Sequence, residues 1–366
     1  MIKDTQQKIK AVRYCVALGF VPHMEVVVRF LADTSDSPCD LTDIDVLGIM
    51  PGAEAPSLRV IFDCKTLNKM SPINRAFWAK GLMEVTHSSE AFVILGKPAI
   101  EAHRLAGNSF GVRLFSEQLF DKFATSASAN YLVPNSYLEN INSWAKLTEI
   151  HKHYPPLSDL LTFLNSTALL QLIGTQGVRN LMSHMRHASG EMDPSKDTHR
   201  SVFKLAVAQF SIFVNEMVRD FHNIFDPQAD KTQFERTLRY YIWGGKDNYD
   251  LRQKLNSAIK ASRGVKEIEP FEFPEWDRFV DYFRICLDSP LSLCATCLPI
   301  KDMAFRELAS PVPDIDRRLS ARLKANNRVR QFALAAISYF AEASKVPREF
   351  SEQFSSELNS LIDKDG

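Results

Sequence analysis

The sequence predicts an α/β domain over residues 1–123 and an all-α domain over residues 138–366. Short runs rich in Val, Ile, Leu and Phe alternate with helical patterns in the first third of the chain. Beyond it, helical periodicity continues without any β alternation of comparable length. Residues 124–137, ATSASANYLVPNSY, are small, polar and turn-prone. This segment is therefore expected to be a linker between the two domains.

The expected α/β domain begins with a helix over residues 3–18. Ile9, Val12 and Val16 lie on one helical stripe, and Gly19 follows as a stop. Bounded apolar runs then predict five strands, at residues 24–31, 43–50, 58–65, 90–96 and 111–115. Helical patterns at 73–85 and 99–106 lie between them. Together these elements predict a mixed sheet flanked by helices.

The second domain is expected to be one irregular helical unit. Apolar periodicity predicts helices at residues 157–173, 178–187, 198–225, 231–243, 250–261, 276–287, 314–343 and 347–362. No short-period repeat is evident in this part of the sequence. We expect this domain to contact substrate, mediate oligomerisation or dock a partner.

Composition limits the classes of function. Lys and Arg together number 44, as do Asp and Glu, so there is no global attraction to nucleic acid or to an anionic membrane. No apolar run approaches the roughly 20 residues of a membrane span, and the first residues lack the apolar core of a signal peptide. Six scattered cysteines suit reduced thiols. We therefore expect a cytoplasmic protein with no membrane partner.

The most informative segment is DIDVLGIMPGAEAPSLRVIFDCK, residues 43–65. If residues 51–57 form the connection of a hairpin, residue 50 faces residue 58, and Asp45 lies opposite Asp63. Side chains of a strand alternate between its faces, so Lys65 shares a face with Asp63. The hairpin therefore brings two carboxylates and an ammonium together.

This group of side chains is suited to phosphodiester chemistry. Two carboxylates bind a hard cation such as Mg²⁺, and a nearby ammonium can orient or help to deprotonate a water while it offsets charge on a phosphate. Like charges facing each other across strands are destabilising unless a cation neutralises them. A solvated surface hairpin is the simpler alternative, but it does not explain why Asp63 and Lys65 interrupt a strand as apolar as LRVIF.

Asp45, followed after a turn by Asp63-Cys64-Lys65, resembles the core of PD-(D/E)xK nucleases. The likeness is to Mrr-like restriction endonucleases and archaeal-type Holliday-junction resolvases, and it covers roughly residues 1–123. It includes a first helix ending in GF, the DIDVLG and VIFDCK strands, the helix RAFWAKGLMEV and the strand FVILG. The resemblance implies that Asp45, Asp63 and the backbone carbonyl of Cys64 bind Mg²⁺, with Mn²⁺ as a substitute. It also implies that Lys65 is the catalytic lysine.

The chain departs from this pattern at the first helix. Many resolvase-like members have a glutamate there, but residues 1–24 contain none, and Glu25 is the nearest substitute as a further metal ligand. The resemblance implies a metal-dependent endonuclease that acts on DNA, in prokaryotic defence or restriction. The alternative is a degenerate nuclease fold that serves as a binding or scaffold subunit.

A second candidate site lies in the helical half. In VRNLMSH, Arg179, Asn180 and His184 match the R-x4-H pattern of HEPN ribonucleases, in which Arg and His activate a ribose 2′-hydroxyl without a metal. The pattern is short enough to arise by chance. The alternative is a helix that carries exposed polar residues.

A basic stripe on the expected helix 314–343 is a candidate nucleic-acid contact. It contains Arg317, Arg318, Arg322 and Arg328. Such a stripe also suits a solvated helix face. The expected partners are DNA and a second copy of the chain. Because the sequence lacks G-x4-G-K-[ST], any ATP-driven step would need a separate ATPase or helicase subunit.

Overall fold

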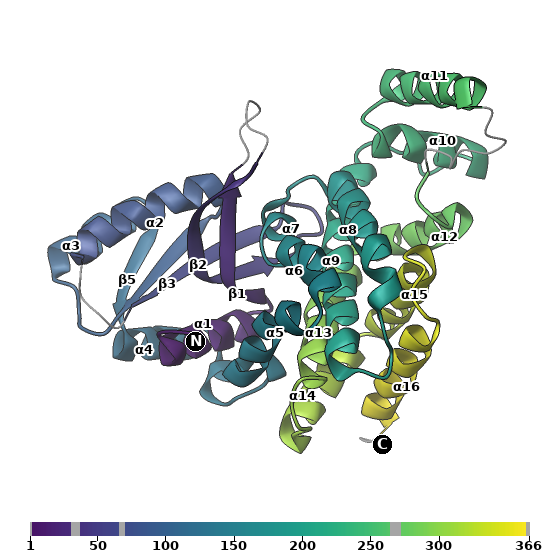
Figure 1. Cartoon of the computed structure of the whole chain (residues 1–366). Helices are drawn as coiled ribbons and strands as arrows, with labels where there is room; N and C mark the ends of the chain where they lie inside the picture. The colour runs from purple at the N-terminus through teal and green to yellow at the C-terminus, as the bar shows by residue number, and fades with distance from the viewer. Residues whose placement is uncertain (1, 31–36, 66–69, 264–271, 364–366) are drawn as a thin grey trace.

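The computed structural model describes residues 2–30, 37–65, 70–263 and 272–363. It confirms a five-stranded mixed sheet with flanking helices, followed by a helical part (Figure 1). The strands are β1 (Val21–Phe30), β2 (Cys39–Met50), β3 (Leu58–Lys65), β4 (Glu90–Leu95) and β5 (Val112–Ser116). The helices around them are α1 (Thr5–Ala17), α2 (Pro72–Thr86), α3 (Glu101–Ser109) and α4 (Glu117–Ala127).

The strands follow one another across the sheet in the order β1-β2-β3-β4-β5. The first three are antiparallel, and β3, β4 and β5 are parallel, with α2 and α3 as the crossovers between them. These two helices cover one face, while α1 and α4 cover the other (Figure 1). The β2–β3 pairing joins Val46 to Phe62, which confirms the register expected for the hairpin.

The first two strands are longer than expected. Strand β1 begins at Val21, directly after Gly19 ends the α1 region with φ of +86° and Phe20 turns the chain. Strand β2 begins at Cys39 because its polar first half pairs with the end of β1. Polar residues obscure this half of β2 in the sequence pattern. Leu31, the last residue of the expected first strand, lies outside the described residues.

Helix α1 packs very closely on the sheet. A Cβ on Gly48 would lie 2.8 Å from Cys15 Sγ and 2.9 Å from a methyl group of Val60, so a larger residue at this position of β2 would displace these side chains. The same face of the sheet has an aromatic core, in which the ring of Tyr14 contacts Phe62 and Phe92. This packing fixes α1, and therefore any side chain that α1 directs toward β2.

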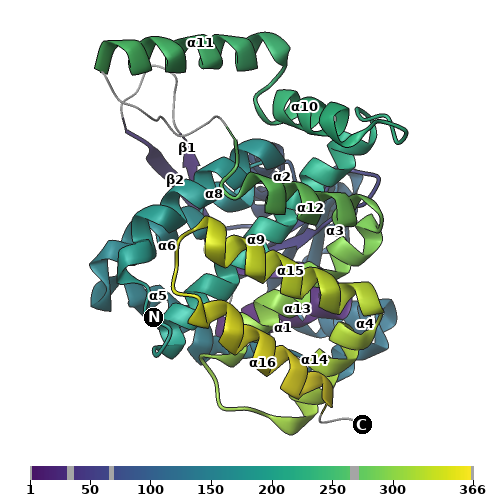
Figure 2. The same ribbon diagram turned by 90° about the vertical axis from the view of Figure 1, so that its right-hand side faces the viewer.

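The second part of the chain is all helical (Figures 1 and 2). Its helices are α5 (Ile141–His153), α6 (Ser158–Leu164), α7 (Thr167–Leu170), α8 (Gly174–Ala188), α9 (Asp197–His222), α10 (Lys231–Ile242), α11 (Lys246–Arg263), α12 (Trp276–Leu287), α13 (Pro290–Arg306), α14 (Pro313–Lys324), α15 (Asn327–Ala343) and α16 (Glu349–Asp363). Figure 2 shows α15 and α16 side by side on the outside, and α11 apart from the main body.

Helix α9 forms the centre of the helical part and packs against α8, α12, α13 and α15. By length and composition it is the one described helix that could cross a membrane, or one of two if the bent pair α12 and α13 is counted as a single span. However, 94% of its apolar window is buried inside the protein, as is typical of a core helix.

Several helices differ from the sequence expectation. The helix expected over 314–343 is two helices, because the chain breaks before Asn326, whose side chain accepts a hydrogen bond from Arg328 N and caps α15. The helix expected over 157–173 is likewise split into α6 and α7. Helix α13 was not expected, since Pro299 in its interior interrupts the helical signal.

The segment 124–137 differs from the expected linker because it is folded into the structure. Helix α4 continues to Ala127, and short 3₁₀ turns follow at Ala129–Leu132 and Tyr137–Glu139. The side chains of Tyr131 and Tyr137 are buried. Its small polar residues cap these turns, as Ser136 Oγ does by accepting a hydrogen bond from Leu138 N.

The two parts of the chain are in extensive contact. The loop between β2 and β3 docks on α9, where Asn215 Nδ2 donates to Gly52 O at 2.8 Å and Ser57 N donates to Glu216 Oε1 at 3.3 Å. One cluster of buried apolar residues runs through both parts. The sheet and the helices therefore share a core.

Candidate active site

The structure brings Asp45, Asp63 and Lys65 together where β2 and β3 diverge. Beyond the pair Val46–Phe62 the ladder ends, and the Asp45 carboxylate fills the gap between the strands. Its Oδ2 accepts hydrogen bonds from Cys64 N at 2.8 Å and from Lys65 Nζ at 2.9 Å. Lys65 Nζ also lies 3.6 Å from Asp63 Oδ1. One ammonium therefore bridges the two aspartates.

Two helices add further cations to this acidic cluster. From α1, Lys8 Nζ lies 2.9 Å from Asp45 Oδ1 and also pairs with Glu25. From α2, Arg75 Nη1 donates to Asp63 Oδ2 at 2.7 Å. Helices α1 and α2 cover opposite faces of the sheet, so the cluster is paired from both sides, at Asp45 by Lys8 and at Asp63 by Arg75.

Lys8 and Arg75 are members of the cluster that were not expected from the sequence. A signal for Lys8 exists, because Lys8, Val12 and Cys15 have helical spacing and lie on the side of α1 that faces the sheet. A lysine that is 2% exposed on such a stripe needs a buried partner. Arg75 had no comparable signal, since the pattern of its helix does not show which residue meets β3.

Glu25 is the third carboxylate of the cluster. Strand β1 pairs Met24 with Val46 and Val26 with Ile44, so Glu25 falls opposite Asp45. Its φ of +55° is a left-handed conformation that is uncommon for a residue other than glycine. Its carbonyl accepts a hydrogen bond from Asn165 Nδ2 at 2.9 Å, so the helical part helps to hold this backbone.

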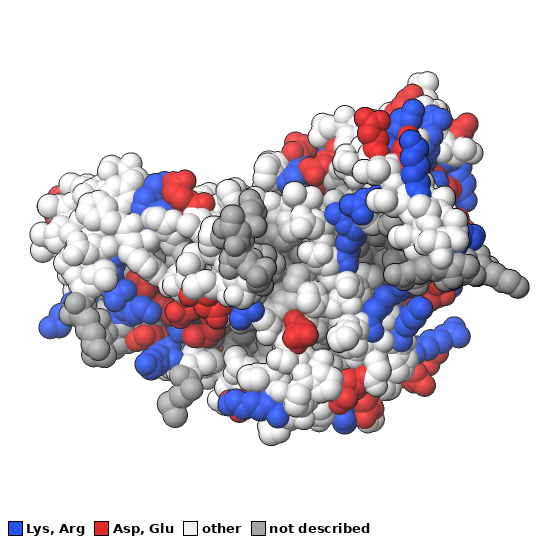
Figure 3. Space-filling model, turned by 45° about the horizontal axis from the view of Figure 1, so that its top comes forward, with Lys and Arg blue, Asp and Glu red and all other residues white. Residues whose placement is uncertain are grey.

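The cluster is only partly open to solvent. The side chains of Asp45 and Asp63 are each 4% exposed, whereas those of Lys65 and Glu25 are 32% and 29% exposed. On the face drawn in Figure 3, acidic side chains flanked by basic ones gather over the N-terminal part. A substrate would therefore meet Lys65 and Glu25 before it met the two aspartates.

Burial and pairing set the charges in the cluster. Burial raises the pKa of Asp63 above its ordinary value, and Arg75 opposes that rise only in part. Burial acts to lower the pKa values of Lys8 and Lys65, but the charge of Asp45 outweighs it, and both pKa values are raised. Both lysines are therefore ammonium ions at neutral pH.

One carboxylate oxygen of the cluster accepts no hydrogen bond. Asp63 Oδ1 is buried and accepts no hydrogen bond, and its contact with Lys65 Nζ is a long one of 3.6 Å, whereas Asp63 Oδ2 and both oxygens of Asp45 have closer partners. An unsatisfied buried carboxylate oxygen is costly, and a cation would relieve that cost. Among the described residues, no group of three or more His, Cys, Asp and Glu side chains converges as a metal site. A cation would thus depend on two aspartates and backbone oxygen.

Cys64 directs its thiol away from the cluster. The side chain is fully buried in the core, and burial raises the pKa of the thiol well above its ordinary value. The thiol is therefore not a candidate thiolate ligand. The proposed role of the Cys64 carbonyl stays a prediction.

The structure places Arg179 and His184 on α8, with other partners. The guanidinium of Arg179 donates to the carbonyl of Ile242 and lies 4.9 Å from the centroid of the Trp243 ring. The ring of His184 stacks on Phe163 at 4.5 Å, and burial lowers the pKa of this histidine. Residues five positions apart on a helix point about 140° apart. The two side chains are thus not brought together within one chain.

The arginine stripe is divided between two helices. Arg317, Arg318 and Arg322 lie on α14, and Arg328 lies on α15. Arg322 turns inward, where it pairs with Asp302 and donates to Asn135 O at 3.0 Å. It therefore has a structural role, and only the other three remain candidates for nucleic-acid contact.

Comparison with protein-family models finds no match to this chain. Searches of curated proteins and of solved structures likewise find no significant match. The function therefore has to be inferred from the chemistry of the site.

Proposed function

We propose that the N-terminal domain is a metal-dependent endonuclease that hydrolyses phosphodiester bonds in DNA. The observation that carries this proposal is the unsatisfied oxygen of Asp63, buried beside Asp45 and within 3.6 Å of the Lys65 ammonium. A buried anion with one free oxygen is suited to a hard cation. The adjacent ammonium is suited to a phosphate.

Each residue has a defined part in this proposal. Asp63, Asp45 and the Cys64 carbonyl would hold Mg²⁺, which when bound polarises the phosphoryl group and acidifies water. Arg75 fixes one oxygen of Asp63, so that the other keeps a constant orientation. Lys65 is partly exposed and positively charged, so it would donate hydrogen bonds to a phosphate oxygen and stabilise the charge that develops there.

The preference for DNA, and a role in defence or restriction, rest on the resemblance to restriction and resolvase enzymes. The helical part would supply substrate or partner contacts. Arg317 and Arg328 are exposed and Arg318 is partly exposed, so these residues would contact the DNA backbone.

A second candidate function is a scaffold built on an inactive nuclease fold, and a specific observation favours it. Lys8, Lys65 and Arg75 balance the charges of Glu25, Asp45 and Asp63 without any metal. Lys8 also comes from the first helix, where the resemblance leads one to expect a glutamate. An ammonium beside Asp45 occupies the space in which a metal would otherwise neutralise that aspartate.

The test is incubation of the purified full chain with supercoiled plasmid, linear DNA and RNA, in Mg²⁺, in Mn²⁺ and in EDTA. The proposal predicts DNA cleavage in either metal and none in EDTA. No cleavage under any condition, with metal binding also absent by calorimetry, would favour the scaffold. RNA cleavage that survives EDTA and is lost in Arg179→Ala/His184→Ala would instead establish the ribonuclease.

A further inference from the structure

A cavity of about 300 Å³ lies between strand β1 and the helical part, apart from the acidic cluster. Helices α5, α6, α9 and α13 supply its other walls. Most of its lining surface is apolar and includes Val21, Met24, Val27, Leu161 and Ile212. Thr148 and His151 also line it and are exposed, so the cavity reaches solvent beside α5. Half of its lining residues are polar, and they include Arg29. Cavities of this size, with a largely apolar surface and several polar groups, are typical of small-molecule sites.

A lysine is buried in this apolar surrounding. Lys301 of α13 is 3% exposed and lines the cavity. Its Nζ lies 2.6 Å from Nδ1 of His23 and 5.5 Å from the centroid of the Trp144 ring. No carboxylate of the described residues forms an ion pair with it. Burying an ammonium without an anion is strongly unfavourable, and burial accordingly lowers the pKa of Lys301 well below its usual range.

Two further polar atoms at the cavity have no partner. His23 is 8% exposed and Gln209 is 4% exposed, and both line the cavity. Neither Nε2 of His23 nor Oε1 of Gln209 has a hydrogen-bond partner. If Nδ1 of His23 accepts from Lys301, its Nε2 carries the proton and is a donor. One donor and one acceptor, His23 Nε2 and Gln209 Oε1, are thus left without a partner at this cavity, beside an amine that is bonded to His23 Nδ1.

We propose that this cavity binds a small organic anion with an apolar body. Its acidic group, a carboxylate or a sulfonate, would accept hydrogen bonds from Lys301 and His23. A hydroxyl or amide of the ligand would donate to Gln209. The apolar body would contact Met24, Leu161 and the other apolar walls. Such a ligand would satisfy the two unpaired atoms and give Lys301 an anion, while fitting a space of about 300 Å³. This inference does not depend on the proposed nuclease activity.

The test uses the full chain and two matched probes. The first, 8-anilinonaphthalene-1-sulfonate, has an anionic group on an apolar body. The second, N-phenyl-1-naphthylamine, has the same body without the sulfonate. Fluorescence titration should show one site for the sulfonate on the wild-type protein. Lys301→Met should weaken sulfonate binding at least tenfold and change binding of the neutral probe less than twofold. Lys324→Met, at an exposed lysine of α14, should leave both unchanged.

A thermal melt of each variant without probe shows whether the variant is folded, so that a loss of probe binding can be assigned to the cavity. Lys301→Met should melt no lower than wild type, because it replaces a buried amine that forms no ion pair with a described residue by an apolar side chain of similar length. Leu161→Trp fills the cavity from the α6 side and should exclude both probes. The proposal is overturned if wild type does not bind the sulfonate, if Lys301→Met binds it as tightly as wild type, or if Leu161→Trp, folded, binds both probes normally.

Discussion

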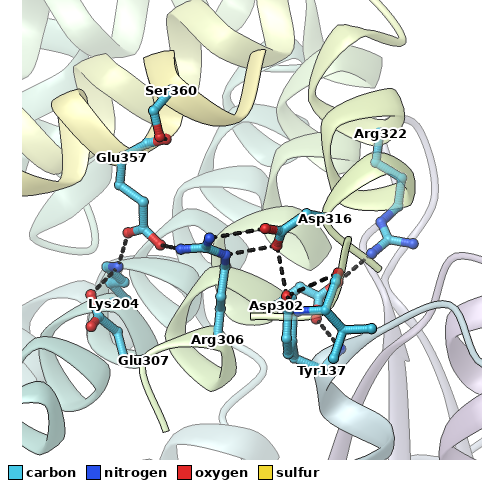
Figure 4. A network of polar contacts seen from close by, with 10 residues as sticks. Tyr137, Lys204, Asp302, Arg306, Glu307, Asp316, Arg322, Glu357 and Ser360 are labelled. Atoms are coloured by element: carbon cyan, nitrogen blue, oxygen red, sulfur yellow. Dashed lines mark hydrogen bonds and ion pairs between the residues drawn. The ribbon is translucent and has the colours of Figure 1, made fainter. Parts of the chain in front are cut away.

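The acidic cluster of the sheet and an ion-pair network around α13 both place carboxylates beside cations. The network consists of Asp302 with Arg322, Arg306 with Asp316 and Glu357, and Lys204 with Glu357 and Glu307. The two groups differ in how many carboxylate oxygens accept hydrogen bonds. In the network, Asp302 Oδ1 accepts from Ser136 Oγ and Tyr137 N, each at 2.8 Å, and Oδ2 accepts from Arg322 (Figure 4). In the cluster, only Oδ2 of Asp63 accepts a hydrogen bond, and Oδ1 has the longer 3.6 Å contact with Lys65 Nζ.

The other carboxylates of the network are equally well paired, although Nε of Arg322 has no hydrogen-bond partner. Arg306 holds Asp316 through two nitrogens, at 2.7 and 3.0 Å, and Glu357 through a third, at 2.7 Å (Figure 4). Lys204 joins Glu357 to Glu307. Tyr137 of the connecting segment donates its hydroxyl to Asp316 at 2.7 Å. Fully paired carboxylate oxygens are typical of structural networks, whereas a buried carboxylate oxygen that accepts no hydrogen bond, beside a partly exposed ammonium, is typical of a binding site.

The largest expected effect is a loss of stability when a carboxylate of the ion-pair network is removed. Asp302→Ala leaves Arg322 and the amide of Tyr137 without their acceptor, so it should lower the free energy of unfolding by about 3 kcal/mol. Urea denaturation followed by circular dichroism measures this. The control Asp314→Ala removes an exposed pair with Arg317 and should change stability by less than about 0.5 kcal/mol. Equal stability of the two variants would show that the network is not structural.

A second change tests what Lys8 does at Asp45. Lys8→Glu puts a carboxylate on the first helix in place of the ammonium, so the cluster should need a cation more strongly. The variant should melt lower than wild type in EDTA, and half-maximal cleavage should need roughly tenfold less Mg²⁺, since an added ligand charge increases affinity.

The control for this change is Lys10→Glu on the same helix. Lys10 pairs with Glu117 and Asp121, outside the cluster, so any loss of stability there should be independent of Mg²⁺. If Lys8→Glu and Lys10→Glu respond identically to Mg²⁺, Lys8 does not occupy a cation position.

The smallest expected effect concerns acid stability of the network. Burial acts to raise the pKa of Glu307, but Lys204 and Arg200 outweigh it and the pKa is lowered. Ionised Glu307 therefore stabilises the fold above the unfolded pKa of roughly 4.3, and that contribution is lost as pH falls through the lowered pKa. Glu307→Gln should cost about 1 kcal/mol at pH 7.

Denaturation curves from pH 7 down to pH 3 measure this difference. The gap between wild type and Glu307→Gln should narrow as the pH falls below about 4.3. Glu352→Gln, in an exposed pair with Arg348, should show no such trend. A gap that is constant with pH would mean that the charge of Glu307 adds nothing to stability.

The residues of the acidic cluster that could be predicted from the sequence are those whose positions depend on local strand geometry. Strand alternation and the length of one turn sufficed to place Asp45 opposite Asp63, with Lys65 beside them. Lys8 and Arg75 reach the cluster from helices on opposite faces, and their positions depend on packing such as the contact of Cys15 with Gly48. No local pattern contains that information.

Dependence on distant packing also explains why the linker expected at residues 124–137 is instead folded into the structure. Its small polar residues are typical of turns, and the structure does contain short turns there. Their burial depends on residues far along the chain, since Tyr137 contacts Asp302 and Asp316. A composition that predicts turns does not show whether those turns are exposed.

The most direct test of the account is the rate of plasmid nicking by Asp63→Asn in Mg²⁺. Asparagine keeps the shape of the side chain and an oxygen for Arg75, but it removes the charge that would hold a cation. We expect a loss of more than about 100-fold relative to wild type, with Asp121→Asn on α4 unchanged. Nicking by folded Asp63→Asn at the wild-type rate would contradict the assignment of Asp63 as a metal ligand.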